Sequence, residues 1–210
     1  LRDLEQRALA AMPPPSVAHP RDAKDAPPGD AFVETAPAFA MTPDSAALVL
    51  DATVVVRPSA GSDKGVQQVL RVVSAPRPEA NLQAAWSADE GAALKATAAS
   101  LMADSLDIAL RLSHRPADDK QAFRTLRYGF GDRERMERGQ LLDETCGRMV
   151  IRTLRGALLV VPHGAGATLP DGCPAAPAVA ERVRPEPPAA AASGVSAAAA
   201  PAASAASAGA

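Results

Sequence analysis

The chain has 210 residues, 20 of them proline, with a formal net charge of −2 and a pI of about 5.9, which leaves room for one domain with tails or for two small domains. This charge balance argues against a general affinity for nucleic acid or for an anionic membrane surface. The sequence contains no apolar run of about 18 residues, so it predicts no transmembrane helix.

Both ends of the chain differ in composition from the middle. The segment 1–31 is charged and rich in proline, and the tail 171–210 is mostly Ala, Pro, Ser, Gly and Val apart from a charged patch at 181–186. Neither segment can bury enough apolar surface to offset the entropy of ordering, so both are predicted to be largely disordered. We therefore expect a single domain at residues 32–170. The chain begins with Leu1, so a signal peptide or a lipid-anchored cysteine could precede it as a membrane tether.

Two strands open the predicted domain. The segment 46–56 alternates, and one face carries only apolar residues: Leu48, Leu50, Ala52, Val54 and Val56. The turn-forming segment 58–65 then separates it from a second β-branched run, Val66 to Ser74. The two runs are predicted to form an antiparallel hairpin.

The segment from Trp86 to Pro116 predicts one long amphipathic helix. Its stripe recurs at steps of three and four residues: Leu94, Ala98, Leu101, Ser105, Ile108 and Leu112. Ser87 and Glu90 have the spacing of a capping box at the helix start, and Pro116 forbids continuation at the other end. Trp86 precedes the predicted cap, where an apolar side chain often packs on one four residues into the helix. That position is Gly91, which has no side chain, so we expect the Trp86 ring to pack in the core instead.

Three further strands are expected after the helix. The segments 123–128 and 133–142 read as strands, with a short helix as the alternative for the second. The apolar run 148–161 reads as one strand in which Gly156 marks a bulge or a bend. The resulting order is β-β-α-β-β-β. We therefore predict an α+β fold with a mainly antiparallel sheet, the long helix packed on one face and disordered termini.

Cys146 and Cys173 are the two cysteines of the chain. In the cytosol two reduced thiols are expected, whereas in an oxidising compartment the pair could close a loop of about 28 residues as a disulfide. No local signature marks Cys146 as a nucleophile, and His19, His114 and His163 lie far apart in sequence.

Basic residues are concentrated between Lys120 and Arg155. The candidate interaction surface consists of Arg124, Arg127, Arg152 and Arg155, with the rings of Phe123, Tyr128 and Phe130 as stacking platforms for an anion or RNA. The acids interleaved in the segment 132–138 favour the alternative, in which arginines and acids pair across neighbouring strands. Nucleic-acid binding is therefore not expected.

No stretch of the chain carries a catalytic or cofactor-binding signature. A Gly-x-Ser-x-Gly elbow, a His-Glu-x-x-His pair and a phosphate-binding Gly-Lys-Ser/Thr loop are all missing from the sequence. We therefore predict no cofactor, no metal site and no enzymatic activity. An enzyme with a dispersed site remains an alternative, because spacing in sequence would not reveal it.

The organisation resembles small lipoproteins of the Gram-negative cell envelope. The resemblance covers residues 32–162 and rests on the two strands, on Trp86-Ser-Ala-Asp-Glu-Gly91 before the alanine-rich helix, and on Phe123-Arg-Thr-Leu-Arg-Tyr128, Met136-Glu-Arg-Gly139, Cys146-Gly-Arg148 and Arg152-Thr-Leu-Arg-Gly156. These motifs are structural and imply no functional residue. One departure is that no cysteine near Leu1 could take a lipid.

The resemblance implies a non-enzymatic scaffold or protein-binding module with an envelope protein as its partner. The expected location is the periplasm or, through an upstream tether, the outer membrane. The alternative is a cytosolic anion- or nucleic-acid-binding domain that uses the arginine-rich sheet face.

Overall fold

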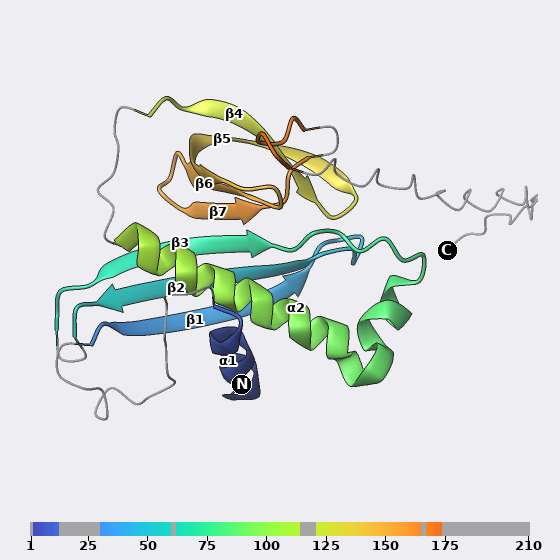
Figure 1. The fold of residues 1–210 in the computed structure, drawn as a ribbon, viewed down its shortest axis with the longest axis horizontal. Helices are drawn as coiled ribbons and strands as arrows, with labels where there is room; N and C mark the ends of the chain where they lie inside the picture. Colours follow the sequence, from blue (N-terminus) through green and yellow to red (C-terminus); the bar gives the residue numbers. More distant parts are fainter. Residues whose placement is uncertain (1, 13–29, 60–61, 114–120, 165–166, 174–210) are drawn as a thin grey trace, which may run out of the picture. The chain divides into compact units, whose positions relative to one another are not determined.

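A seven-stranded sheet with two helices is formed by the residues that the computed structural model describes, which are 2–12, 30–59, 62–113, 121–164 and 167–173. All of them belong to the unit Leu1–Ala180. The prediction of disorder for residues 13–29 and 174–210 concerns residues outside the described ranges. The elements in chain order are α1 (Arg2–Ala10), β1 (Phe32–Met41), β2 (Leu48–Arg57), β3 (Val66–Val73), α2 (Leu82–Ser113), β4 (Arg124–Phe130), β5 (Arg133–Glu144), β6 (Met149–Thr153) and β7 (Leu158–Val161) (Figure 1).

The sheet is mixed, with the strand order β1-β2-β3-β7-β6-β5-β4. The fold is α+β, but the expectation of a mainly antiparallel sheet is corrected by the central pair, because β3 runs parallel to β7 with Leu70 opposite Leu158. The predicted hairpin of β2 and β3 is present. Each half of the sheet is antiparallel. The connection between the parallel neighbours β3 and β7 is long, as parallel pairing requires, and consists of α2 followed by β4, β5 and β6.

Two strands differ from the expected order. β1 was not predicted, because Pro37 and several alanines give it weak strand propensity, yet it pairs along its whole length with β2. The run 148–161 is not one strand but a hairpin, in which Gly156 (φ +81) donates its N–H to the Thr153 carbonyl at 3.0 Å and turns the chain from β6 into β7. A positive φ at that turn suits glycine.

The long helix starts earlier than predicted and contains a break. Asn81 is the N-cap, since the Ala84 N–H donates to Asn81 Oδ1 at 3.1 Å. The predicted capping box is therefore wrong: the Ser87 hydroxyl donates to the Gln83 carbonyl at 2.8 Å instead. The break follows at residues 88–91, which have non-helical backbone angles. Pro116, the predicted stop, lies outside the described residues.

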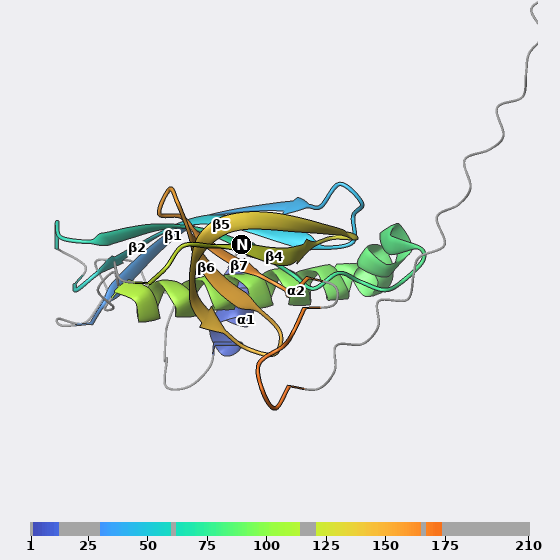
Figure 2. The same ribbon diagram turned by 90° about the horizontal axis from the view of Figure 1, so that it is seen from above.

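The first core lies between the sheet and the two helices. In Figure 2, α1 and α2 are on the same side of the strands, and α2 contacts β2 and β3. The middle of the predicted stripe of α2 is buried there with Ile108 fully inside, whereas Leu94 and Leu112 at its ends are partly buried. Ala8 of α1 joins the same cluster, so α1 packs against this core. Each fully buried large aliphatic side chain contributes about 1.5–3 kcal/mol, which holds the helix on the sheet.

The second core lies on the opposite face of the sheet and is formed by side chains of β4, β6 and β7 together with Ala47, Val49 of β2 and Val73 of β3. Its centre is formed by Tyr128, Ile151, Leu159 and Val161. Tyr128 forms an antiparallel bridge with His163, and the Gly129 N–H donates to the Pro162 carbonyl at 3.1 Å. The segment after β7 therefore contacts β4, which brings β4 and β7 together on this face of the sheet.

Candidate functional site: a free sheet edge and a pocket under the long helix

β1 is an edge strand whose outer side faces away from the sheet. At its end, the Thr42 N–H donates to the Ala47 carbonyl at 2.9 Å, so this pair is of the hydrogen-bonded type. Hydrogen-bonded and non-hydrogen-bonded pairs alternate along an antiparallel ladder. The even-numbered residues of β1 therefore bond to β2, and the odd-numbered residues direct their backbone groups outward. Pro37, which has no N–H to donate, occupies an outward position, as this register requires.

These outward groups form the β1 edge, which consists of Val33, Thr35, Pro37, Phe39 and Met41. Among the described residues, no strand pairs with this side of β1. The side chains of Phe39 and Met41 are 37% and 38% exposed, although large apolar residues are usually buried. The second half of the β1 edge thus combines unpaired backbone groups with exposed apolar side chains.

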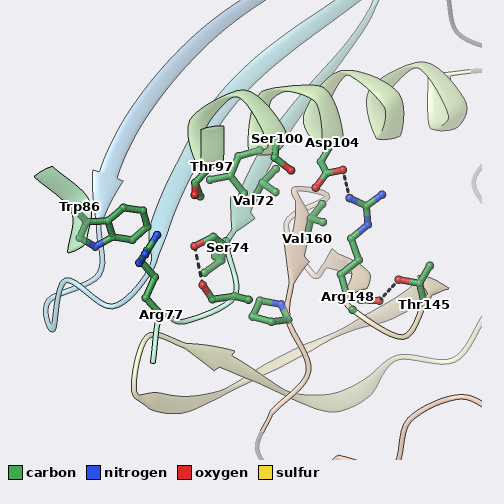
Figure 3. A pocket seen from close by; sticks show the side chains of 15 residues that line it. Val72, Ser74, Arg77, Trp86, Thr97, Ser100, Asp104, Thr145, Arg148 and Val160 are labelled. Atoms are coloured by element: carbon green, nitrogen blue, oxygen red, sulfur yellow. Dashed lines mark hydrogen bonds and ion pairs between the residues drawn. The ribbon is translucent and has the colours of Figure 1, made fainter. Parts of the chain in front are cut away.

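A pocket of about 520 Å³ lies under α2, where β3 and β7 end. Figure 3 shows Thr97, Ser100 and Asp104 on the helix, with Val72 directly beneath it and Val160 further down. Its remaining walls come from the segment after β3, the β5–β6 loop and Trp86. We call this cavity the Trp86 pocket; it is lined by Val72, Val73, Ser74, Ala75, Arg77, Trp86, Thr97, Ser100, Leu101, Asp104, Thr145, Gly147, Arg148, Val160 and Pro162.

One end of the Trp86 pocket is built around the tryptophan ring. Trp86 is buried, as expected, and its indole N–H donates to the Ser45 carbonyl at 2.8 Å. The Arg77 guanidinium lies over the ring, 4.7 Å from its centroid. Glu79 accepts hydrogen bonds from Nε and Nη2 of Arg77 and so fixes the plane of the guanidinium.

The other end of the Trp86 pocket is held by an ion pair between Arg148 and Asp104. Arg148 belongs to the β5–β6 loop, where its carbonyl accepts the Thr145 N–H at 2.9 Å. Between Thr145 and Gly147 of this loop stands Cys146, which forms a disulfide with Cys173, with 5.3 Å between the two Cα atoms. The disulfide therefore fixes the segment 167–173 to one wall of the Trp86 pocket.

The four arginines of the predicted interaction surface do not share one face. Arg124 and Arg127 are three residues apart on β4, so they point to opposite faces of the strand. Arg127 pairs with Glu134 at 3.2 Å, Arg152 lies on β6 opposite Gln140, and Arg155 lies in the turn before β7.

The three rings proposed as stacking platforms are also separated by their environments. Tyr128 is buried in the second core, and burial raises the pKa of its phenol. The Arg135 guanidinium covers the Phe130 ring at 3.9 Å from the centroid, whereas Phe123 is 43% exposed. A single basic and aromatic face is therefore not formed.

The histidines and cysteines form no reactive cluster in the described part of the chain. His163 is 3.7 Å from Glu144 through Nδ1, and its Nε2 is 2.7 Å from the Thr145 carbonyl. Cys146 has no thiol in this structure because it is disulfide-bonded. His19 and His114 lie outside the described residues. No group of three or more His, Cys, Asp or Glu side chains within the described ranges could hold a metal ion.

The charged residues of the Trp86 pocket were not predicted as a site from the sequence, although Arg148 was noted in the motif Cys146-Gly-Arg148. Arg77, Asp104 and Arg148 come from three segments far apart in the chain, so no local spacing joins them. The only available signal was an arginine between Pro76 and Pro78, shortly before the single tryptophan of the chain.

Comparison with protein-family models, with curated proteins and with solved structures found no match to this chain. None of the described helices is long and apolar enough to cross a membrane.

Proposed function

We propose that this chain is a non-enzymatic binding module of the bacterial cell envelope, located in the periplasm or tethered to the outer membrane, and that the β1 edge takes up an extended segment of a protein partner. The observation that carries the proposal is the outward row of backbone groups on β1 beside the exposed side chains of Phe39 and Met41. Strand addition to such an edge gains main-chain hydrogen bonds, and apolar side chains next to it add specificity.

The disulfide supports the proposed compartment. Disulfides persist in oxidising compartments such as the periplasm and are rare in the bacterial cytosol. The Cys146–Cys173 bond therefore favours the envelope over the cytosolic alternative. The division of the four arginines between two faces and a turn gives no support to a nucleic-acid-binding surface.

The register of β1 offers a sharp test of strand addition. Phe39→Pro removes an N–H that points outward and leaves the hydrogen bonds to β2 in place. The native Pro37 already lacks an N–H at an equivalent outward position. A photo-cross-linking amino acid at residue 40 of the full chain, expressed in the native host, is expected to give a discrete adduct with an envelope protein. We expect Phe39→Pro to abolish this adduct and Phe39→Val to retain it.

Two controls complete this experiment. Ala38→Pro removes an inward N–H and is expected to lower the stability of the fold, whereas Phe39→Pro leaves the melting temperature nearly unchanged. A cross-linker at Leu154, which is 61% exposed in the β6–β7 turn, is expected to give no adduct. Persistence of the residue-40 adduct in Phe39→Pro would contradict strand addition.

A further inference from the structure

One face of β4, together with the adjoining parts of β5 and β6, lies outside both cores. Side chains alternate between the two faces of a strand, and Leu126 of β4 and Ile151 of β6 point into the second core. Their neighbours therefore point to the other face, and residues opposite one another on paired strands share it. We call this surface the outer β4–β6 face; with one residue of the β6–β7 turn it consists of Arg127, Met136, Arg138, Arg152 and Leu154.

The arginines of the outer β4–β6 face are only partly neutralised. Arg127 pairs with Glu134 at 3.2 Å, and its side chain is still 68% exposed. Arg138 and Arg152 have no ion-pair partner among the described residues, and the residues opposite them on the paired strands are uncharged. Charges further away than about 8 Å are largely screened at physiological ionic strength. This surface is therefore locally positive, although the whole chain has a net charge of −2.

Two apolar side chains stand among these arginines. Met136 is 64% exposed and Leu154 is 61% exposed, which makes them the two most exposed large apolar side chains of the described residues. Met136 lies opposite Arg127 and two positions before Arg138 on the same face, and Leu154 follows Arg152 by two positions. The least covered apolar side chains are thus next to the least neutralised charges. A partner that fits this surface has to offer both negative charge and an apolar environment.

We propose that the outer β4–β6 face binds the surface of a bilayer that contains anionic phospholipids. Arg138 and Arg152 donate hydrogen bonds to lipid phosphates, and Met136 and Leu154 enter the boundary between headgroups and acyl chains. These two side chains favour a bilayer over an acidic protein segment, which would pair with the arginines but supply no apolar layer. β1 and β4 stand at the two ends of the strand order, so either this proposal or strand addition to the β1 edge can fail without the other.

Co-sedimentation of the full-length oxidised protein with vesicles tests the proposal. One set of vesicles contains equal amounts of phosphatidylcholine and phosphatidylglycerol, and the other contains phosphatidylcholine alone. We expect saturable binding to the mixed vesicles and at least tenfold weaker binding to the neutral ones. Binding to the mixed vesicles is expected to weaken at least tenfold between about 50 mM and about 500 mM NaCl, because salt screens the arginines.

The arginine variants keep the change of net charge constant and alter the face on which it occurs. An arginine close to an anionic bilayer contributes about fivefold to binding, so the double variant Arg138→Gln, Arg152→Gln is expected to bind the mixed vesicles about 25-fold more weakly. The double variant Arg138→Lys, Arg152→Lys is expected to retain most of the binding. Arg124→Gln, Arg133→Gln is the matched control: it removes the same charge from the opposite face of β4 and β5, and we expect wild-type binding.

An apolar variant tests the other half of the contact. Met136→Ser, Leu154→Ser leaves the net charge unchanged and is expected to weaken binding to the mixed vesicles at least fivefold. The protein is also titrated with poly-glutamate, to which we expect weaker binding than to the mixed vesicles. Circular dichroism and thermal unfolding of each variant show whether a loss of binding is instead a loss of folding.

Three outcomes would overturn the proposal. The first is no saturable binding of the wild type to the mixed vesicles. The second is an equal loss of binding in the arginine variants of the two faces, which would reduce the effect to net charge. The third is tighter binding of poly-glutamate than of the mixed vesicles that Met136→Ser, Leu154→Ser leaves intact, which would assign the surface to an acidic protein segment.

Discussion

The carboxylate of Asp44 links two turns that are far apart in the chain. It accepts hydrogen bonds from Thr42 Oγ1 at 2.5 Å and from the Ala46 N–H at 3.1 Å within the β1–β2 loop, and from the Asp132 N–H at 2.5 Å in the β4–β5 turn. Gly131 makes the approach possible, because a Cβ there would lie 2.4 Å from Asp44 Oδ1. Burial alone would raise the pKa of Asp44, but these hydrogen bonds outweigh it and lower the pKa below 3.8.

We expect Asp44→Asn to destabilise the fold by about 1–2 kcal/mol at pH 7, because an amide accepts fewer hydrogen bonds than a carboxylate. A folded-state pKa below the unfolded value means that the ionised group stabilises the fold above about pH 4. The difference between variant and wild type should therefore shrink as the pH falls through the lowered pKa. Denaturant unfolding from pH 7 down to pH 3 measures it. The exposed residue Asp63 provides the control, and a pH-independent difference would contradict this role of Asp44.

Patterns of single residues in the sequence predicted which side chains of α2 are buried better than they predicted where the helix begins. The apolar spacing of α2 was enough to identify its buried face, since a periodic stripe must be covered. The Ser87–Glu90 pair matched a capping box, but such a pattern carries no information on competing contacts. Asn81 caps the helix six residues earlier than Ser87, and the indole of Trp86 donates its hydrogen bond to Ser45, which lies in a distant loop.

At the scale of the element, the close contact between β5 and β6 depends on Gly139. A Cβ at this position would lie 2.5 Å from Ile151 Cγ2 and 2.6 Å from the Arg152 carbonyl oxygen. The second of these atoms belongs to the backbone and cannot move aside without disturbing the strand pairing. Gly139 therefore permits β5 to follow β6 around the second core.

We expect Gly139→Ala to lower the free energy of unfolding by about 1–3 kcal/mol through overpacking. Gly147 is the matched control, because a Cβ there meets no atom within 4 Å. Gly147→Ala should change the free energy of unfolding by less than about 1 kcal/mol. Urea unfolding of the two variants measures both free energies. Similar losses at the two positions would show that the approach of β6 to Gly139 does not limit the side chain at this position.

The elements that sequence patterns identified were those with their own apolar periodicity. β2 and β3 alternate strongly and were expected as a hairpin, whereas β1 gains its structure from pairing with β2 and has little pattern of its own. The turn at Gly156 was expected only as a bulge or a bend, because the apolar residues Met149 to Ile151 of β6 and the whole of β7 gave the segment 148–161 the pattern of one strand. The Trp86 pocket could not be predicted, since its charged residues meet only after β3, α2 and the β5–β6 loop have packed together.

At the scale of the molecule, the Cys146–Cys173 bond closes a loop that contains β6 and β7. The two cysteines are separated by 27 positions in the sequence. For a loop of this length, restriction of the unfolded chain is worth about 3 kcal/mol. We expect the double variant Cys146→Ser, Cys173→Ser to lose an amount of this order, and its stability to be insensitive to reductant.

Chemical unfolding with and without reductant measures the contribution of the disulfide. The wild type in reductant is expected to approach the stability of the double variant. A wild-type protein whose stability does not change on full reduction of the disulfide would show that the bond does not stabilise the fold.

β7 is the last strand in the part of the chain that the structure describes, and it joins the two halves of the sheet. β7 lies between β3 and β6, and it also carries the chain to the bridge of His163 with Tyr128. Synthesis proceeds from the N-terminus, so β3 and β6 both present open edges until Val161 has been added and β7 has inserted between them. In an unfinished or truncated chain, the unpaired edges of β3 and β6 would therefore be open to pairing with other chains, in addition to the β1 edge that stays open in the complete sheet.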